Sequence, residues 1–156
     1  MSLVLDSSAT LAWIFADEAT ESVRSVFHAV AEQGAFVPSL LRLEIANSLT
    51  GAVRRRRIDG EFRRAALADL GDLDITVDAQ TDSRAWNATL DFADRFLLTV
   101  YDAAYVELAQ RLALPLATLD EDMRRPSARV ETPRRRLIYR PQRSRARSTP
   151  RAPNSG

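Results

Sequence analysis

Short apolar runs alternate with amphipathic segments along this chain, and that alternation predicts its elements. The apolar runs, which have the length of buried strands, are residues 2–6, 35–38, 74–77 and 114–120. Between them, apolar residues recur every three or four positions, as helices require; Val23, Val26, Phe27 and Val30 are an example. Helices are predicted over residues 8–15, 21–33, 39–57, 61–70, 82–92 and 97–112.

Short apolar strands separated by helices predict an α/β fold with a central parallel sheet flanked by helices, a three-layer, Rossmann-like architecture. The chain has 156 residues, of which 46% are hydrophobic, enough for one domain with its own core. We place this domain at residues 1–132.

Charge divides the chain into an acidic body and a basic tail. Residues 1–123 hold 20 acids against 11 arginines, a balance of −9, whereas residues 124–156 hold 11 arginines and one acid, Glu131. Residues 133–156 are rich in Arg, Pro and Ser and have little to bury, so we predict a disordered tail. Such a tail either holds nucleic-acid backbone weakly or is an unselected extension.

Several chemistries are excluded by composition. The chain has no cysteine, no lysine and a single histidine, His28, which removes thiolate nucleophiles, Schiff bases and zinc sites built from cysteine or several histidines. No apolar run approaches the roughly 20 residues of a membrane helix, and the amino terminus lacks a signal-peptide pattern. We expect a cytoplasmic protein without membrane contact.

Four acids occupy unusual positions. Asp6 and Asp120 directly follow predicted strands, Asp102 lies in the first turn of a predicted helix, and Glu44 borders the apolar stripe of another. The carboxyl ends of parallel strands meet at one rim of a sheet, and ligands bind there where the strand order reverses. Topology therefore directs at least Asp6 and Asp120 to one crevice.

Each acid also has a purely structural interpretation, which the sequence leaves open. These are helix capping for Asp6, a capping box with Thr99 for Asp102, an Asx turn for Asp120, and an ion pair with Arg42 or Arg63 for Glu44. Two carboxylates about 4 Å apart repel by about 4 kcal/mol at an effective dielectric near 20, so a cluster favours a bound cation. Oxygen ligands alone suit Mg²⁺ or Mn²⁺, ions typical of phosphodiester chemistry.

Four blocks of sequence resemble the PIN-domain family, in particular the VapC-type ribonuclease toxins of toxin–antitoxin pairs. The blocks are VLDSSATLAWIF, LLRLEIANSL, LTVYDAAYVELAQRL and LPLATLDEDMRR. They follow the order and spacing of the family over about residues 1–130, and TVYDAAYVELA is the most specific of them.

The resemblance implies site residues. The family's acidic quartet falls on Asp6, Glu44, Asp102 and Asp120. The first three would hold the principal Mg²⁺ or Mn²⁺, and Asp120 would serve a second ion or orient the attacking water. Supporting positions are Ser7, Ser8, Thr118 and, as an alternative to Asp120, Asp122. We favour Asp120 because it directly follows the strand.

The resemblance further implies a metal-dependent endoribonuclease, usually dimeric, that is held inactive by a VapB-type antitoxin; DNA would be bound only through the antitoxin. One alternative is a catalytically silent PIN-like module that binds an arginine-rich antitoxin peptide or nucleic acid. Another is a phosphatase of the haloacid dehalogenase type. This is disfavoured because Ser8 stands where that family needs a second aspartate, and because lysine is absent.

Overall fold

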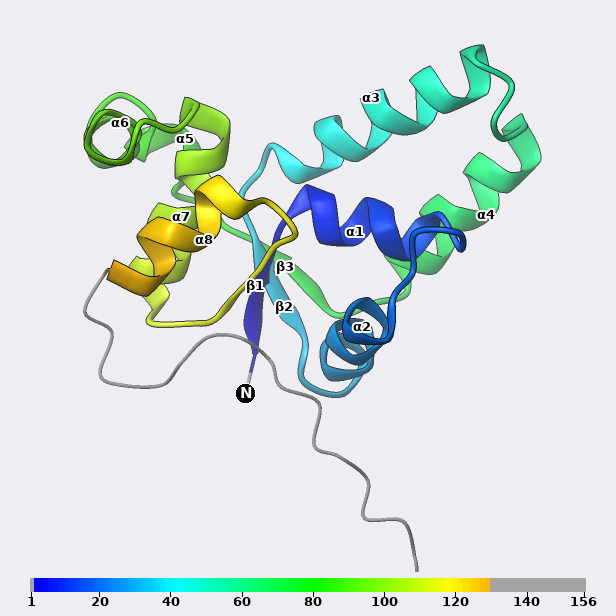
Figure 1. Cartoon of the computed structure of the whole chain (residues 1–156), viewed down its shortest axis with the longest axis horizontal. Coiled ribbons are helices and arrows are strands. Elements are labelled where there is room, and N and C mark those ends of the chain that lie inside the picture. Colours follow the sequence, from blue (N-terminus) through cyan, green and yellow to red (C-terminus); the bar gives the residue numbers. More distant parts are fainter. Residues whose placement is uncertain (1, 130–156) are drawn as a thin grey trace, which may run out of the picture.

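Four short strands form a parallel sheet in the order β3-β2-β1-β4 in this computed structural model, which describes residues 2–129 (Figure 1). The strands are β1 (Leu3–Leu5), β2 (Ala35–Val37), β3 (Ile75–Val77) and β4 (Leu116–Ala117). All three pairings are parallel. The chain adds β2 and β3 on one side of β1 and then crosses to its other side for β4. The strand order therefore reverses between β1 and β4, and in open parallel sheets ligand sites lie at such a point, beyond the carboxyl ends of the strands.

Helices cover both faces of this sheet. They are α1 (Ser7–Ile14), α2 (Glu21–Gln33), α3 (Leu41–Arg54), α4 (Gly60–Gly71), α5 (Thr81–Arg84), α6 (Ala88–Phe96), α7 (Val100–Leu112) and α8 (Glu121–Arg129). In Figure 1, α7 and α8 lie on one side of the strands and α1 and α2 on the other, while α3 and α4 extend outward as a hairpin. The predicted α/β class is thereby confirmed.

The core forms where the apolar stripes of the helices meet the sheet. Val4 and Leu5 of β1 are fully buried, as are Leu49 of α3 and Tyr105 of α7. β1 is apolar at all three positions because helices cover it on both faces, as expected of a central parallel strand.

The helix predicted over residues 82–92 is wrong, because two helices, α5 and α6, occupy this region. Asn87 interrupts them: its Oδ1 accepts from the Ala88 amide at 2.6 Å and its Nδ2 donates to the Ser83 carbonyl at 3.1 Å. An asparagine that bonds the local backbone competes with helix propagation. Trp86 is 91% exposed, so no packing holds a continuous helix here.

Other boundaries differ by a few residues. The helix predicted at 39–57 forms over Leu41–Arg54 and ends before Arg56, whose φ of 58° leaves the helical region. The helix predicted at 97–112 begins only at Val100, because Leu97 adopts φ 55° as the C-cap of α6. Helix α8 was not predicted. The domain boundary at residue 132 and the predicted disordered tail lie outside the described residues.

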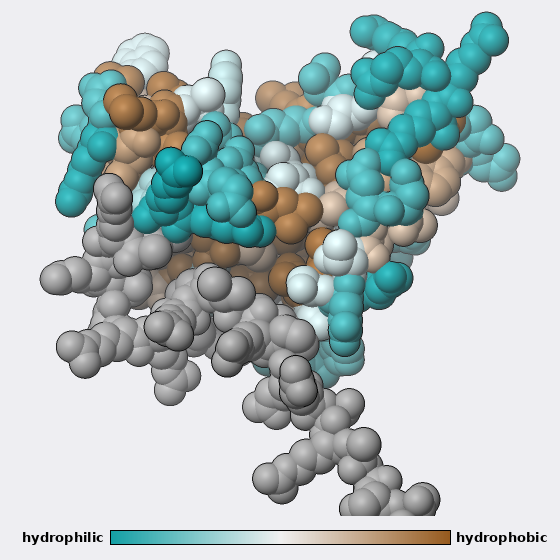
Figure 2. All heavy atoms as spheres, in the orientation of Figure 1, coloured by the Kyte–Doolittle hydropathy of each residue, from teal (hydrophilic) through white to brown (hydrophobic). Residues whose placement is uncertain are grey.

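The surface is uneven in polarity. Hydrophilic atoms gather over the outer ends of α3 and α4, where Arg54–Arg57 lie exposed, whereas hydrophobic atoms are visible around α6 (Figure 2). Trp86, Leu90 and Leu97 are the exposed large apolar residues of this second region. Among the helices of residues 2–129, none is both long and apolar enough to cross a membrane.

Candidate functional site

Asp6 lies at the carboxyl end of β1, where the strand order reverses. It is the N-cap of α1 and is 1% exposed. Its Oδ1 accepts from the Ser7 amide at 2.6 Å, and its Oδ2 accepts from the hydroxyls of Ser8 at 2.5 Å and Thr118 at 2.8 Å. Burial raises the pKa of Asp6, and the hydrogen bonds from Ser8 and Thr118 offset part of that rise. The predicted capping role is thus real, but capping does not require such deep burial.

The two hydroxyl groups connect the ends of β1 and β4. Leu5 and Ala117 are partners in the sheet, so the residues that follow them emerge side by side. Thr118 Oγ1 accepts from the Asp120 amide at 3.0 Å, and Ser8 Oγ accepts from the Leu119 amide at 2.9 Å. Each hydroxyl thus donates to the Asp6 carboxylate and accepts from the loop after β4, which fixes that loop beside Asp6.

Asp120 and Asp122 differ in their surroundings. Asp120 is half-buried, and its Oδ1 accepts from the Asp122 amide at 2.7 Å, in the Asx turn that opens α8. Asp122 is exposed. Through its own amide and Thr118, Asp120 is linked to Asp6, whereas Asp122 contacts Asp120 through its backbone amide.

Glu44 lies half-buried in the first turn of α3, and the hydroxyl of Tyr105 donates to its Oε2. Burial is the main cause that raises the pKa of Glu44, and repulsion from Asp6 and Asp102 raises it further. Hydrogen bonds from Tyr105 and Ser7 act in the opposite direction. The proposed ion pair with Arg42 or Arg63 is absent from the ion pairs of residues 2–129; Glu44 instead lies among other acids.

Asp102 stands half-buried in the first turn of α7 and interacts with the N-cap residue Thr99. The Thr99 hydroxyl accepts from the Asp102 amide at 3.1 Å and donates to Asp102 Oδ2 at 2.6 Å. A capping box would instead pair this carboxylate with the Thr99 backbone amide. The Asp102 side chain is therefore held by a hydroxyl, as Asp6 is.

Glu44 comes within electrostatic reach of both Asp6 and Asp102, which repel it. Asp120 joins them only through Thr118 and its bond to Asp6. As the side chains stand, residues 2–129 contain no group of three acids or histidines close enough to hold one ion. The donor atoms are carboxylate and hydroxyl oxygens, which in chemistry fit Mg²⁺ or Mn²⁺.

The sequence interpretation missed Tyr105 as a polar member of the site. Its hydroxyl is the donor to Glu44, although the side chain is 0% exposed and otherwise belongs to the core. Burial, together with the hydrogen bond to Glu44, raises the pKa of Tyr105, so the hydroxyl remains a donor. One signal was available: Tyr105 follows Asp102 by three positions and so shares its helix face.

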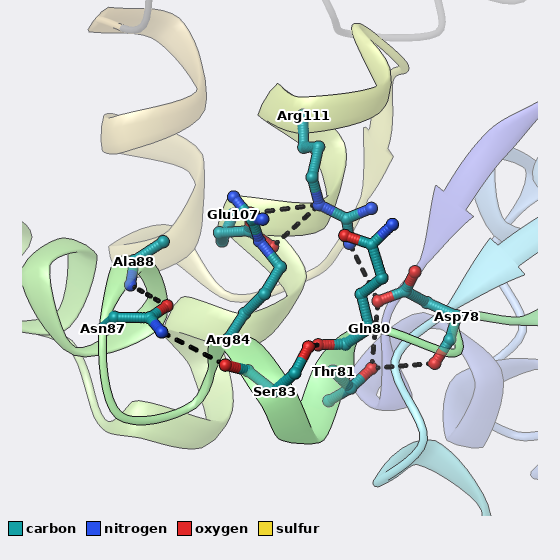
Figure 3. A network of polar contacts seen from close by, with 9 residues as sticks. All are labelled: Asp78, Gln80, Thr81, Ser83, Arg84, Asn87, Ala88, Glu107 and Arg111. Carbon is teal, nitrogen blue, oxygen red and sulfur yellow. Dashed lines mark hydrogen bonds and ion pairs between the residues drawn. The ribbon is translucent and has the colours of Figure 1, made fainter.

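A second charged cluster was also missed. Glu107 of α7, 5% exposed, contacts Arg84 and Arg111, and Arg111 also contacts Asp78 (Figure 3). The spacing of Glu107 and Arg111 on one helix indicates their pairing. Arg84 and Asp78 come from elsewhere in the chain, so the sequence offered no comparable signal for them.

Comparison with known proteins supplies a family match. The family model for the PIN domain matches residues 3–128. The chain is 29% identical over 134 residues to Ribonuclease VapC3 of Pyrobaculum aerophilum, an alignment that covers 85% of this chain and 100% of that protein. Among solved structures, PAE2754 from Pyrobaculum aerophilum has a TM-score of 0.58 at 19% identity, covering 81% of this chain and 85% of the other. At this identity the structural likeness supports the fold alone.

Proposed function

This chain belongs to the PIN domain family, and from that membership we propose that it is a Mg²⁺- or Mn²⁺-dependent endoribonuclease, acting in the cytoplasm as the toxin of a toxin–antitoxin pair. The similarity to Ribonuclease VapC3 supports the reaction class. The observation that carries the proposal is the position of Glu44, half-buried and repelled by both Asp6 and Asp102. Within residues 2–129, none of these three acids forms an ion pair with a basic side chain.

Each site residue has a proposed role. Asp6, Glu44 and Asp102 hold the principal ion, and Asp120 serves a second ion or orients the attacking water. Ser7, Ser8 and Thr118 position Asp6 through the hydrogen bonds described above. Asp120 is preferred to Asp122 as the fourth acid because it is half-buried and linked through Thr118 to Asp6.

The proposed reaction is hydrolysis of an RNA phosphodiester bond. The chemistry that a bound divalent cation supplies here is neutralisation of phosphate charge and a lowered pKa of water. The carboxylates orient the attacking water in line with the leaving oxygen, and the described site contains no histidine that could act as the base. The hydroxyls of Ser8 and Thr118 hold the Asp6 carboxylate in one position before substrate arrives.

The proposed partners are a cognate VapB-type antitoxin and a second copy of the chain. Large apolar side chains lie exposed around α5 and α6: Trp86 is 91% exposed, Leu90 42% and Leu97 92%. Figure 2 shows hydrophobic atoms around α6. Apolar patches of this kind are typical of protein interfaces, which supports a protein partner.

The test is RNA cleavage by the purified chain freed of any partner. We expect cleavage with Mg²⁺ or Mn²⁺ and none in EDTA. Asp6→Asn and Asp102→Asn should each reduce the rate by about a thousandfold or more, corresponding to about 4 kcal/mol, because each removes a ligand that carries negative charge.

A matched pair of substitutions addresses the fourth acid. Asp120→Asn should slow cleavage strongly, whereas Asp122→Asn, the same change two residues along on an exposed side chain, should leave the rate nearly unchanged. Folding of every variant is checked by circular dichroism. Wild-type rates in folded Asp6→Asn and Asp102→Asn variants would refute the site. Absence of any cleavage, with tight binding of an arginine-rich peptide, would favour the catalytically silent module.

A further inference from the structure

Tyr105 connects Glu44 to the helix that carries Asp102. The family match gives this tyrosine no role. It stands three residues after Asp102, nearly one turn along α7, and its hydroxyl reaches across to Glu44 on α3. The two acids belong to different helices, 58 positions apart in sequence by their numbers. Tyr105 therefore fixes the α3 acid relative to the helix that carries Asp102.

The aromatic ring gives this connection its rigidity. Tyr105 is 0% exposed and lies in the core cluster with Leu5, Ile45 and Leu108. A ring packed on all sides has one available rotamer, so its hydroxyl has a fixed position. Glu44, in contrast, is half-buried, and its neighbour Leu43 is 76% exposed, so the glutamate has solvent on one side.

Electrostatics explains why Glu44 needs such an anchor. The Glu44 carboxylate is repelled by Asp6 and Asp102. Because the side chain is only half-buried, this repulsion favours a rotamer that points toward solvent. A glutamate has three side-chain torsions to order, which costs free energy whenever it is held in one place. A hydrogen bond from a buried hydroxyl to a charged carboxylate opposes both effects.

We propose that Tyr105 is a positioning residue that holds the Glu44 carboxylate near Asp6 and Asp102, so that it contributes to binding of the divalent cation. This inference rests on the proposed function, because it concerns the same ion. It adds a residue whose hydroxyl touches neither the ion nor the RNA and acts only through Glu44.

The test is Mn²⁺ affinity, measured by electron paramagnetic resonance of the free ion up to millimolar concentrations. Tyr105→Phe removes the hydroxyl and keeps the ring, and it should weaken Mn²⁺ binding about tenfold, as loss of a group that orients a metal ligand typically does. Tyr101→Phe is the matched control: the same change on the same helix, next to Asp102, but on a side chain that is 66% exposed. It should leave the affinity within twofold.

A double substitution separates positioning from a general structural effect. In the Glu44→Gln background, Tyr105→Phe should change the affinity by less than twofold, since the group that it positions is no longer a carboxylate. A tenfold loss that persists in this background would overturn the proposal, as would an unchanged affinity in the single variant. Absence of Mn²⁺ binding by the wild-type chain would instead overturn the proposed function, and this inference with it.

A crystal structure of the wild-type chain with Mn²⁺ tests the proposal even if Tyr105→Phe does not fold. We expect Glu44 to bind the ion while it keeps the hydrogen bond from Tyr105. A Glu44 side chain that binds Mn²⁺ only after leaving Tyr105 would show that the tyrosine restrains the glutamate away from the ion, and would refute the inference.

Discussion

Helix α7 carries two acids, of which one lies beside opposite charge and the other does not. Asp102, in its first turn, repels Glu44 and has no basic partner within residues 2–129. Glu107, five residues later, is 5% exposed and is held by Arg84 and Arg111. The comparison separates an acid whose charge is compensated by the chain itself from an acid whose charge the proposed cation would compensate.

The compensated cluster is a complete unit. Arg84 Nε lies 2.5 Å from Glu107 Oε1, Arg111 Nε lies 3.1 Å from the same oxygen, and the other end of Arg111 lies 2.8 Å from Asp78 Oδ2 (Figure 3). Two acids and two arginines balance in charge and connect α5, the end of β3 and α7. We interpret this cluster as structural, because it has no charge left for a ligand.

The largest effect expected from this comparison is on stability. Glu107→Gln leaves Arg84 and Arg111 without their shared counter-charge and should lower the free energy of unfolding by about 3 kcal/mol. This is the low end for a broken buried ion pair, because 32% of the Arg84 side chain is exposed to solvent. Urea unfolding measures this. Glu121→Gln is the control, since the Glu121 side chain is 76% exposed in its pair with Arg124, and it should cost less than about 0.5 kcal/mol. Equal losses in the two variants would remove the distinction between the clusters.

A smaller effect is expected when Mn²⁺ is added. At about thirty times its dissociation constant, Mn²⁺ should raise the free energy of unfolding of the wild-type chain by about 2 kcal/mol, because the ion binds the folded state alone. Glu107→Gln should gain the same increment from its lower starting point, whereas Asp102→Asn should gain much less. Thermal unfolding with Mn²⁺ and with EDTA gives the comparison. A full gain in Asp102→Asn would place the ion elsewhere.

The smallest effect concerns pH in the absence of metal. The pKa of Asp6 is raised in the folded state, so the charged carboxylate lowers the free energy of unfolding. This loss of stability is absent below the pKa of the unfolded chain, about 4, where Asp6 is protonated in both states. It grows as the pH rises through the pKa of the folded state. Asp6→Asn retains a capping residue without the charge. In EDTA it should therefore be more stable than the wild-type chain at pH 7, and no more stable near pH 4.

Asp122→Asn serves as the control, because it removes an acid that is exposed. Urea unfolding at the two pH values should show no comparable gain for it. If Asp6→Asn were less stable than the wild-type chain at both pH values, the Asp6 carboxylate would stabilise the fold as a helix cap rather than destabilise it through its buried charge.

Apolar periodicity predicted most of the elements and failed where the hydrogen bonds of a single polar side chain decide. Helix α2 forms over the predicted residues because its N-cap Thr20 and its C-cap Gly34, at φ 72°, are both encoded locally. The split between α5 and α6 depends on the hydrogen bonds of Asn87, and nothing in the apolar periodicity marks it. The four acids were selected as candidates because each breaks a local pattern, but their mutual arrangement is a matter of topology.

The sequence by itself determined the α/β class, the absence of thiolate, lysine and multi-histidine chemistry, and the candidates Asp6, Glu44, Asp102 and Asp120, because composition and periodicity are properties of the chain alone. Only the tertiary structure decided which charges meet. The reversal of strand order between β1 and β4 sets Asp6 beside Thr118, and packing of α7 against the sheet brings the Tyr105 hydroxyl to Glu44. Contacts between residues 60 or more positions apart depend on how the helices cross the sheet, which the local spacing of residues does not indicate.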